Sequence, residues 1–358
     1  MIKALALVVS IVSSPLTSHR VAAQQTKNVV LVVTDGLRWQ EVFTGADSAL
    51  AARQRPTIRA AFWRATPSAR RETLMPFLWH TVAREGTLLG DRTIGSVVRV
   101  SNGRDVSYPG YNEMLTGRVD PRIRDNDAGK NRNTTVFDWL QSTPEFSSRV
   151  AAYGTWETFN DILNRDRAQF VVRAGWHEPY PSPRTAADSS IDLLYRSMRH
   201  EFDDVAPDAL MHKVVLNDLR VVTPRVMFVG YGETDEWAHS GHYDEVLRAA
   251  HAVDSLIAEL WTTLQSMPEY RGVTTMIITT DHGRGATPKN WRDHNARTRG
   301  SDETWLAVIG PDTPATGSGK NGTPIVTAQI AATLAALLGQ DAALPTRIAP
   351  PISAVIRR

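Results

Sequence analysis

The stretch NVVLVVTDG, residues 28–36, indicates the fold of this chain. Its first seven residues form an unbroken run rich in β-branched side chains, which is typical of a strand buried on both faces of a parallel sheet. An aspartate and a glycine follow at once, where such a strand ends and the chain turns. We therefore expect a buried strand that delivers Asp35 to one edge of a sheet.

Four further runs have the same character and are interpreted as strands. They cover residues 149–154, 225–230, 274–280 and 304–309. Helical patterns lie between them, the clearest over residues 243–264. Another begins at Thr323-Pro324 and ends before Gly339. This alternation predicts a three-layer α/β/α fold around a mostly parallel central sheet.

The composition limits the partners and the metal chemistry of the chain. A formal charge of +2, with no lysine- or arginine-rich run, predicts no nucleic-acid-binding patch. The 358 residues include no cysteine, so disulfides, thiolate zinc sites and iron–sulfur clusters are excluded. Any metal ion must be held by oxygen and imidazole nitrogen.

The first 23 residues are typical of a cleaved export signal. Lys3 precedes a short apolar run, and small residues at positions 21–23 stand where signal peptidase cuts. The run is far shorter than the ~20 residues that a membrane span needs. We expect Gln24 to be the mature N-terminus of an exported, periplasmic or extracellular protein without a membrane span. A buried or disordered N-terminal segment is the alternative.

The remaining chain, residues 24–358, is predicted to form one catalytic domain, since no internal repeat or linker divides it. Residues 176–222 are more polar and irregular than their surroundings. We interpret this segment as a cap insertion around the site.

Chemically active side chains gather at four places in the sequence. These are Asp35-Gly36, Ser107-Tyr108-Pro109-Gly110, Asp235 with His239, and Asp281-His282 with His294. Three of the four follow predicted strands, and ligands of parallel sheets bind beyond the carboxyl ends of strands. Three aspartates, three histidines and a hydroxyl are the ligand set for two divalent cations with mixed oxygen and nitrogen ligands.

Each cluster alone also has a purely structural explanation. An aspartate after a strand is commonly a turn or cap residue, and His239 alone fits an exposed surface position. Ser107 alone fits the cap of a helix that begins at Pro109. Taken together, the clusters favour a metal site, because several carboxylates at one sheet edge would be costly without cations.

The nucleophile segment and the first strand resemble a known family. Residues 32–38, VVTDGLR, resemble the first metal-binding strand of the alkaline phosphatase superfamily. The most similar branch is the type I phosphodiesterase/nucleotide pyrophosphatase group. Residues 107–117, SYPGYNEMLTG, resemble the nucleophile segment of that branch, in which a threonine usually stands at the position of Ser107.

The remaining clusters extend this resemblance in the same chain order. Asp235 and His239 match the Asp-x-x-x-His pair of the branch, Asp281-His282 match its Asp-His pair, and His294 falls where its last histidine ligand is expected. The resemblance runs from about residue 28 to residue 339, nearly the whole expected mature chain.

The resemblance implies a two-metal hydrolase of small phosphate esters, a phosphodiesterase or phosphomonoesterase, with Ser107 as nucleophile and a phosphoseryl intermediate. One metal ion would be held by Asp235, His239 and His294. The other would be held by Asp35, Asp281, His282 and the oxygen of Ser107. Members of the family commonly use zinc, and manganese or iron also fits these ligands. Asn126 resembles the asparagine that contacts a phosphate oxygen in this branch.

The chain departs from the family pattern at several positions. Gly110-Tyr111 stand where the branch has an asparagine–histidine pair, so we expect a different substrate-facing surface. No arginine aligns with the phosphate-clamping arginine of the monoesterases, which leaves monoester or diester preference open. The oligomeric state is not indicated.

Three alternatives stand beside the phosphate-ester hydrolase. Residues 107–111 begin like the Ser-x-Pro-x-Arg signature of sulfatases on the same scaffold, although Tyr111 replaces the arginine. Cofactor-independent phosphoglycerate mutases share the metal ligands but are cytosolic, which the export signal disfavours. A non-catalytic, metal-stabilised binding protein would lack a ligand or the nucleophile, and none is missing here.

Overall fold

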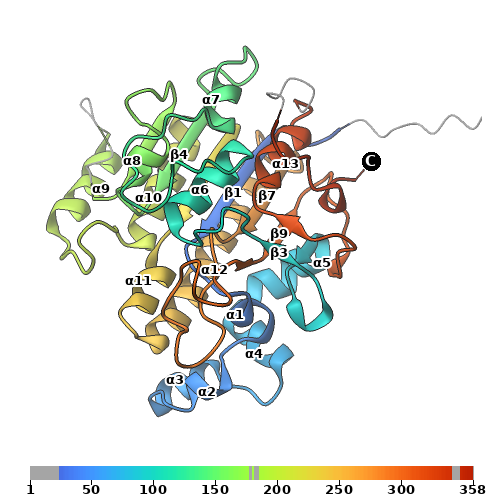
Figure 1. Ribbon diagram of the computed structural model, residues 1–358. Helices are drawn as coiled ribbons and strands as arrows, with labels where there is room; N and C mark the ends of the chain where they lie inside the picture. Colours follow the sequence, from blue (N-terminus) through green and yellow to red (C-terminus); the bar gives the residue numbers. More distant parts are fainter. Residues whose placement is uncertain (1–23, 177–179, 181–184, 341–346, 358) are drawn as a thin grey trace, which may run out of the picture.

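The computed structural model describes residues 24–176, 180, 185–340 and 347–357 (Figure 1). The predicted export signal, residues 1–23, lies outside the described residues, so cleavage before Gln24 stays a prediction. Among the described residues, no helix is both long and apolar enough to cross a membrane.

An eight-stranded sheet forms the centre of the molecule (Figure 1). In spatial order its strands are β10 (Gly317–Ser318), β2 (Thr87–Leu89), β9 (Leu306–Ile309), β7 (Thr274–Thr279), β1 (Asn28–Thr34), β6 (Val226–Tyr231), β4 (Val150–Gly154) and β5 (Val171–Ala174). β1 lies between β7 and β6, is parallel to both, and is buried at every residue. The predicted mostly parallel α/β sheet is confirmed.

β9 departs from the predicted parallel arrangement. It pairs antiparallel with both β7 and β2. The chain returns from β7 to β9 without an intervening helix, and a parallel return needs a crossover of that kind. An apolar run alone cannot show strand direction, because a strand covered on both faces is apolar in either direction. Just before β9, the short β8 (Glu303–Thr304) joins a second sheet with β3 (Val98–Arg99) and β11 (Ile325–Val326).

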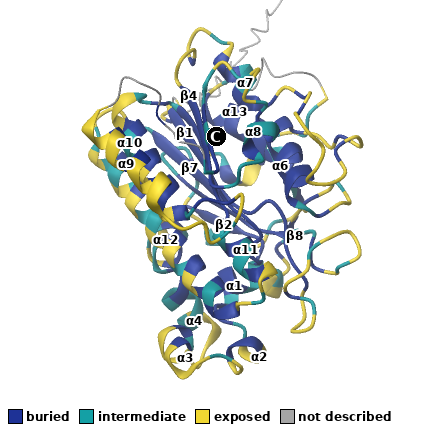
Figure 2. Cartoon of the chain, turned by 90° about the vertical axis from the view of Figure 1, so that its left-hand side faces the viewer, coloured by how far each residue is buried: buried dark blue, intermediate teal, exposed yellow. Residues whose placement is uncertain are grey.

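Helices cover both faces of the central sheet, whereas the helices of residues 39–74 gather at one end of the molecule (Figure 2). In chain order the helices are α1 (Trp39–Thr44), α2 (Ser48–Ala51), α3 (Pro56–Phe62), α4 (Pro67–Leu74), the π-helix η1 (Leu78–Val82), α5 (Ala83–Glu85), the 3-10 helix η2 (Arg92–Ile94), α6 (Ser107–Thr116), α7 (Val136–Gln141), α8 (Phe159–Ile162), α9 (Ala186–Ser197), α10 (Asp208–Val221), α11 (Glu233–His239), α12 (Tyr243–Ser266), α13 (Gln329–Leu337) and the 3-10 helix η4 (Ser353–Val355).

The side chains of β1 alternate between the two faces of the sheet. Val30 and Val32 pack into the core that includes α10 and α12. Val29, Leu31 and Val33 pack into the core that includes α6, α7, α8 and α13. The predicted α/β/α layering follows from this alternation, because successive strand residues point to opposite faces.

Two predicted helices can be compared with the structure. The helix expected over residues 243–264 is present as α12, and its apolar stripe is buried. The helix expected from Thr323-Pro324 begins only at Gln329, so that prediction was wrong at its start. Ile325 and Val326 instead pair with β3 as β11, and the side chain of Gln329 accepts a hydrogen bond from Val326 N. Strand pairing with a distant segment thus overrides the local helix-start signal.

Residues 176–222 contain more regular structure than expected. α9 and α10 lie within this segment, and Val214, Val215 and Leu219 of α10 are fully buried in the core against the sheet. The expectation of irregular structure was therefore wrong over these two helices. The division into one catalytic domain with a cap insertion stays a prediction.

Candidate metal and nucleophile site

The carboxyl ends of three neighbouring strands bring the predicted site residues together (Figure 1). Asp35 follows β1 directly, Asp281 and His282 follow β7, and α11 follows β6 with Asp235 and His239 one turn apart. β6, β1 and β7 are adjacent and parallel, so their carboxyl ends meet at one edge of the sheet.

Asp35, Asp281 and His282 form what we call the inner group. Their donor atoms lie within 4.8 Å of one another, and all three side chains are buried. His282 Nε2 lies 3.4 Å from Asp35 Oδ1 and 3.4 Å from Asp281 Oδ2. Its Nδ1 lies 2.9 Å from Gly283 O and donates to this carbonyl, which directs Nε2 toward the carboxylates.

Asp235, His239 and His294 form what we call the outer group. His239 Nε2 lies 3.1 Å from Asp235 Oδ2 and 2.9 Å from His294 Nε2. His294 Nδ1 bonds to Asp105 O at 3.1 Å, which again directs Nε2 into the site. The side chain of His239 is 48% exposed, so this group opens to solvent.

The two groups meet at His282. Its Nε2 is 3.8 Å from Asp235 Oδ1, and the donor atoms of Asp235, His282 and His294 also lie within 4.8 Å of one another. His239, which the sequence analysis assigned to this set, sits at the exposed rim beside it. The expected ligands therefore lie together, while their assignment to particular metal ions stays a prediction.

Ser107 lies in contact with the inner group. It is the first residue of α6, and its Oγ is 3.1 Å from His282 Nε2. The cap position of α6 is occupied by Val106, without a side-chain hydrogen bond. The alternative that Ser107 serves as a helix cap is therefore contradicted.

Asn126 supports the same end of α6. Its Oδ1 accepts a hydrogen bond from Tyr108 N at 2.9 Å. Its Nδ2 has no partner among the described residues, and the side chain lines the pocket that contains Ser107. The amide NH₂ is thus available to a ligand in that pocket.

The buried donor atoms fit divalent cations. Asp35 Oδ1 and Asp281 Oδ2 are buried without a hydrogen-bond partner within the described part of the chain. Burial and the charge of Asp35 raise the pKa of Asp281 to about 8. Burial lowers the pKa of His282, but Asp281 and Asp35 outweigh this effect and raise it to about 9. Without a bound cation, such a cluster keeps protons that offset the negative charge of its carboxylates. Divalent cations would supply this positive charge instead.

Gly110 and Tyr111 do not line the pocket that contains Ser107, so a substrate-facing surface that differs from that of the branch stays a prediction. A Cβ added at Gly110 would lie 2.5 Å from the carbonyl oxygen of Asp281, so only glycine allows α6 to approach the main chain of Asp281 this closely. The Tyr111 hydroxyl is buried and donates to Asp35 Oδ2 at 3.0 Å. These two residues support the inner group from beneath.

The site opens into a pocket of about 320 Å³. The predicted site residues that line it are Asp35, Ser107, Asn126, Asp235, His239 and His294. The other lining residues were not predicted from the sequence; they are Asp127, Trp156, Thr158, Asp204, Val205, Gly232 and Glu236. Trp156 follows β4 by two residues, so the rule that ligands bind beyond strand ends could have found it.

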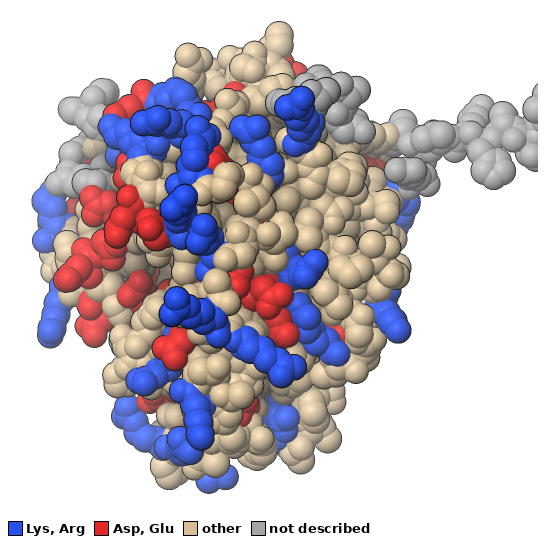
Figure 3. Space-filling model, in the orientation of Figure 1, with Lys and Arg blue, Asp and Glu red and all other residues tan. Residues whose placement is uncertain are grey.

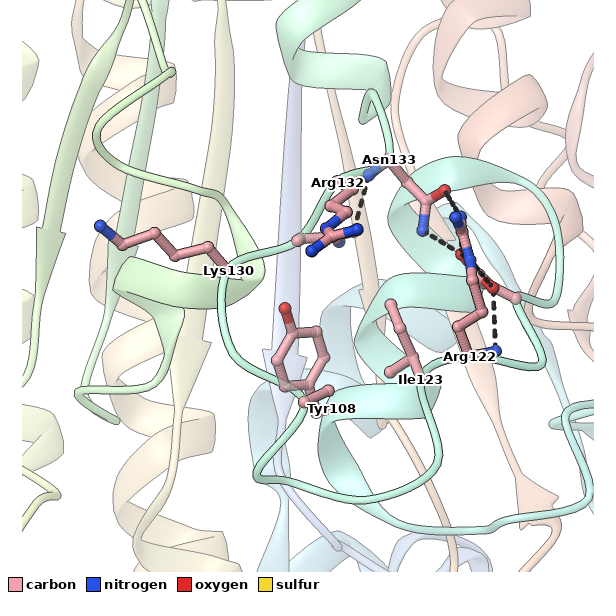
Figure 4. Close-up of a pocket in the computed structure, with 9 residues that line it drawn as sticks. Tyr108, Arg122, Ile123, Lys130, Arg132 and Asn133 are labelled. Carbon is pink, nitrogen blue, oxygen red and sulfur yellow. Dashed lines mark hydrogen bonds and ion pairs between the residues drawn. The ribbon is translucent and has the colours of Figure 1, made fainter.

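A second hollow, of about 160 Å³, lies beside Tyr108 and is lined by the loop around residues 120–133 (Figure 4). Basic side chains gather over α7 and α8 on this side of the molecule (Figure 3). However, Arg122 pairs with Asp120, and Lys130 pairs with Asp166. Arg132 also lines the hollow, and no ion pair joins it to another described residue, so the hollow keeps some positive charge.

Arg284 is a further residue that the sequence analysis missed. Only 1% of its side chain is exposed, and its guanidinium contacts the carboxylate of Asp235. Its position two residues after His282 was the available sequence signal.

Comparison with known proteins agrees with this geometry. The family model of type I phosphodiesterase/nucleotide pyrophosphatase matches residues 47–299. Comparison with curated proteins gives no significant match.

Several solved structures share the fold at low sequence identity. Wild-type alkaline phosphatase PafA is 11% identical, with a TM-score of 0.61, over 94% of this chain and 100% of its own. The lipoteichoic acid synthase LtaP from Listeria monocytogenes is 11% identical, with a TM-score of 0.55, over 92% and 74%. The 2-O GAG sulfatase BT1596 is 13% identical, with a TM-score of 0.51, over 92% and 72%.

Proposed function

Because this chain belongs to the type I phosphodiesterase/nucleotide pyrophosphatase family of the alkaline phosphatase superfamily, we propose that it is an exported two-metal hydrolase of phosphate esters. It hydrolyses small phosphodiesters or phosphomonoesters through a phosphoseryl intermediate on Ser107. The observation that carries this proposal is the place of the Ser107 hydroxyl, which lines the pocket and contacts the inner group.

Ser107 performs the covalent step. Its Oγ loses its proton to solvent and attacks the phosphorus atom, and the ester oxygen leaves with the bonding electron pair and takes up a proton from water. Water then hydrolyses the phosphoseryl bond, which releases phosphate or a phosphomonoester and restores the hydroxyl. Two divalent cations would supply Lewis acidity that activates the hydroxyl and stabilises the leaving oxygen. We propose zinc, because members of the family commonly use it.

The first turn of α6 and Asn126 assist this step. Ser107 stands at the positive end of a ten-residue helix, which favours negative charge on its oxygen and on a bound phosphate. Because Asn126 Oδ1 is held by Tyr108 N, its NH₂ can donate to a nonbridging oxygen.

The contact between Ser107 and His282 also suggests a metal-free base mechanism, which the structure disfavours. In a catalytic triad, a carboxylate orients the histidine through Nδ1. Here Nδ1 of His282 faces the carbonyl oxygen of Gly283 instead. Loss of turnover on removal of metal ions would support the two-metal mechanism, whereas full activity of the metal-free protein would support the base mechanism.

The decisive experiment compares wild type, Ser107→Ala and Ser107→Thr on aryl phosphate monoester, diester and sulfate. We expect Ser107→Ala to fold normally and to lose turnover by a factor of about 10³ or more, because no covalent intermediate can form. Ser107→Thr retains much more activity, since it offers the same hydroxyl. Acid quenching of the wild type, followed by mass spectrometry, should show a phosphoryl group on Ser107.

Three outcomes would contradict the proposal. Wild-type turnover by zinc-loaded Ser107→Ala would exclude Ser107 as the nucleophile. A preference for the sulfate ester would favour a sulfatase. Absence of both zinc binding and turnover in the wild type would favour a non-catalytic binding protein.

Export is tested separately. Mass spectrometry of the secreted protein should show Gln24 at the N-terminus. A retained Met1 would contradict cleavage at that position.

A further inference from the structure

Arg284 is tied directly to a carboxylate of the outer group. Its Nη2 donates to Asp235 Oδ1 and, at 3.1 Å, to the main-chain oxygen of Asp235. Its Nη1 donates to the main-chain oxygen of Arg292. One buried guanidinium therefore joins the first turn of α11 to the loop that carries His294.

Gly36 provides the space for this ion pair. The residue has a φ of +58°, and an added Cβ would lie 2.3 Å from Asp235 Oδ1 and 2.8 Å from Arg284 Nε. The end of β1 is thus built closely around Arg284 and Asp235.

The ion pair divides the two oxygens of Asp235 between different partners. Oδ1 is held by Arg284, whereas Oδ2 lies 3.1 Å from His239 Nε2. A guanidinium is planar and stays charged, so it restricts the orientation of a buried carboxylate. It also balances the charge of that carboxylate when no metal ion is bound.

We propose that Arg284 is a positioning residue that holds Asp235 in its metal-binding orientation, with Oδ2 turned toward His239. The inference rests on the proposed two-metal function. Residues beyond the ligands commonly orient the ligands in this way, and their loss costs about 10- to 100-fold in metal affinity.

The chain offers a matched control in Arg38. Its side chain is 4% exposed, and it also pairs with a buried carboxylate, that of Glu41, and donates to Gly285 O. Glu41 belongs to neither group of metal ligands. Arg38→Met therefore removes a buried cation near the site without touching Asp235.

The experiment measures zinc bound per chain, together with the affinity of each equivalent, in wild type, Arg284→Met, Arg284→Lys and Arg38→Met. We expect two equivalents in the wild type and in Arg38→Met, even if the latter melts at a lower temperature. In Arg284→Met the second equivalent should bind about 10- to 100-fold more weakly, and the first should be unchanged. Arg284→Lys should recover part of this loss, because a lysine keeps the charge.

Two results would overturn the inference. One is wild-type affinity for both equivalents in Arg284→Met, and the other is an equal loss in Arg38→Met. If Arg284→Met does not fold, the test relies on Arg284→Lys. Wild-type affinity of Arg284→Lys for the second zinc equivalent would then contradict the proposal. A wild type that binds no zinc would contradict the two-metal function itself, which separates the two failures.

Discussion

The inner and outer groups contain the same kinds of ligand atoms but are held in different ways. The inner side chains of Asp35, Asp281 and His282 are at most 7% exposed and follow directly from central strands. The outer group rests on the seven-residue helix α11 and on a loop, and its His239 is 48% exposed. Asp235 and His294 of the outer group are only 10% and 6% exposed, so the two groups differ chiefly at His239, the one ligand of the six that lies open to solvent.

The largest expected difference between the two groups is in the loss of turnover when one histidine of each group is replaced by alanine. His282→Ala should lower turnover about 10³-fold or more, because the side chain contacts Ser107 and lies between both groups. His239→Ala should cost about 10- to 100-fold and should recover in excess zinc, since water can replace a ligand at the exposed rim.

Turnover measured across a zinc titration, with circular dichroism as the folding control, tests this difference. Equal losses in both variants, or recovery of His282→Ala by zinc alone, would remove the distinction between the two groups.

The second largest effect is expected from removal of the metal ions, which should lower the folding stability of the protein. The inner group should then determine how the stability of the metal-free protein depends on pH. The raised folded-state pKa values of Asp281, about 8, and His282, about 9, mean that both groups retain protons more strongly when folded. Stability of the metal-free protein is therefore lost as pH rises through these values. We expect its melting temperature to fall between about pH 6 and about pH 9, while the zinc-loaded protein changes less.

Differential scanning calorimetry with and without a chelator measures this effect. A metal-free protein that becomes more stable over the same pH interval would show that the buried carboxylate cluster does not govern stability.

The smallest effect is expected for Tyr111→Phe, which tests the support of the inner group. Loss of its hydrogen bond to Asp35 Oδ2 should cost about 1 kcal/mol of unfolding free energy. Tyr153→Phe is the matched control, because Tyr153 is a buried tyrosine that donates to Asp218 Oδ2 at 3.1 Å, in a different hydrogen-bond network. Only Tyr111→Phe should also alter zinc affinity, and an equal change in Tyr153→Phe would contradict a specific role for Tyr111.

Local sequence predicted the strand β1 and the site residue that follows it. β1 runs from Asn28 to Thr34 as expected, because its apolar run and its terminal Asp-Gly signal come from adjacent residues. The direction of β9 and the start of α13 could not be predicted in this way, since both depend on pairing with distant strands.

The same limit applies to the site. The resemblance to a family indicated the expected ligands, which lie together in the structure. Tyr111 and Arg284 were missed because they act through Asp35 and Asp235, which are 76 and 49 residues away in sequence. Nothing in the local pattern shows which side chain will lie beneath a given carboxylate.

The place of β1 in the sheet has a consequence for the order in which the chain can fold. β1 precedes both of its neighbours in the chain, since β6 (Val226–Tyr231) and β7 (Thr274–Thr279) are made much later. The central strand must therefore remain without its partners while about two hundred residues are added, and closing so long a loop slows folding. A newly made chain therefore cannot assemble the metal site until β7 and the loop that carries His294 have been synthesised.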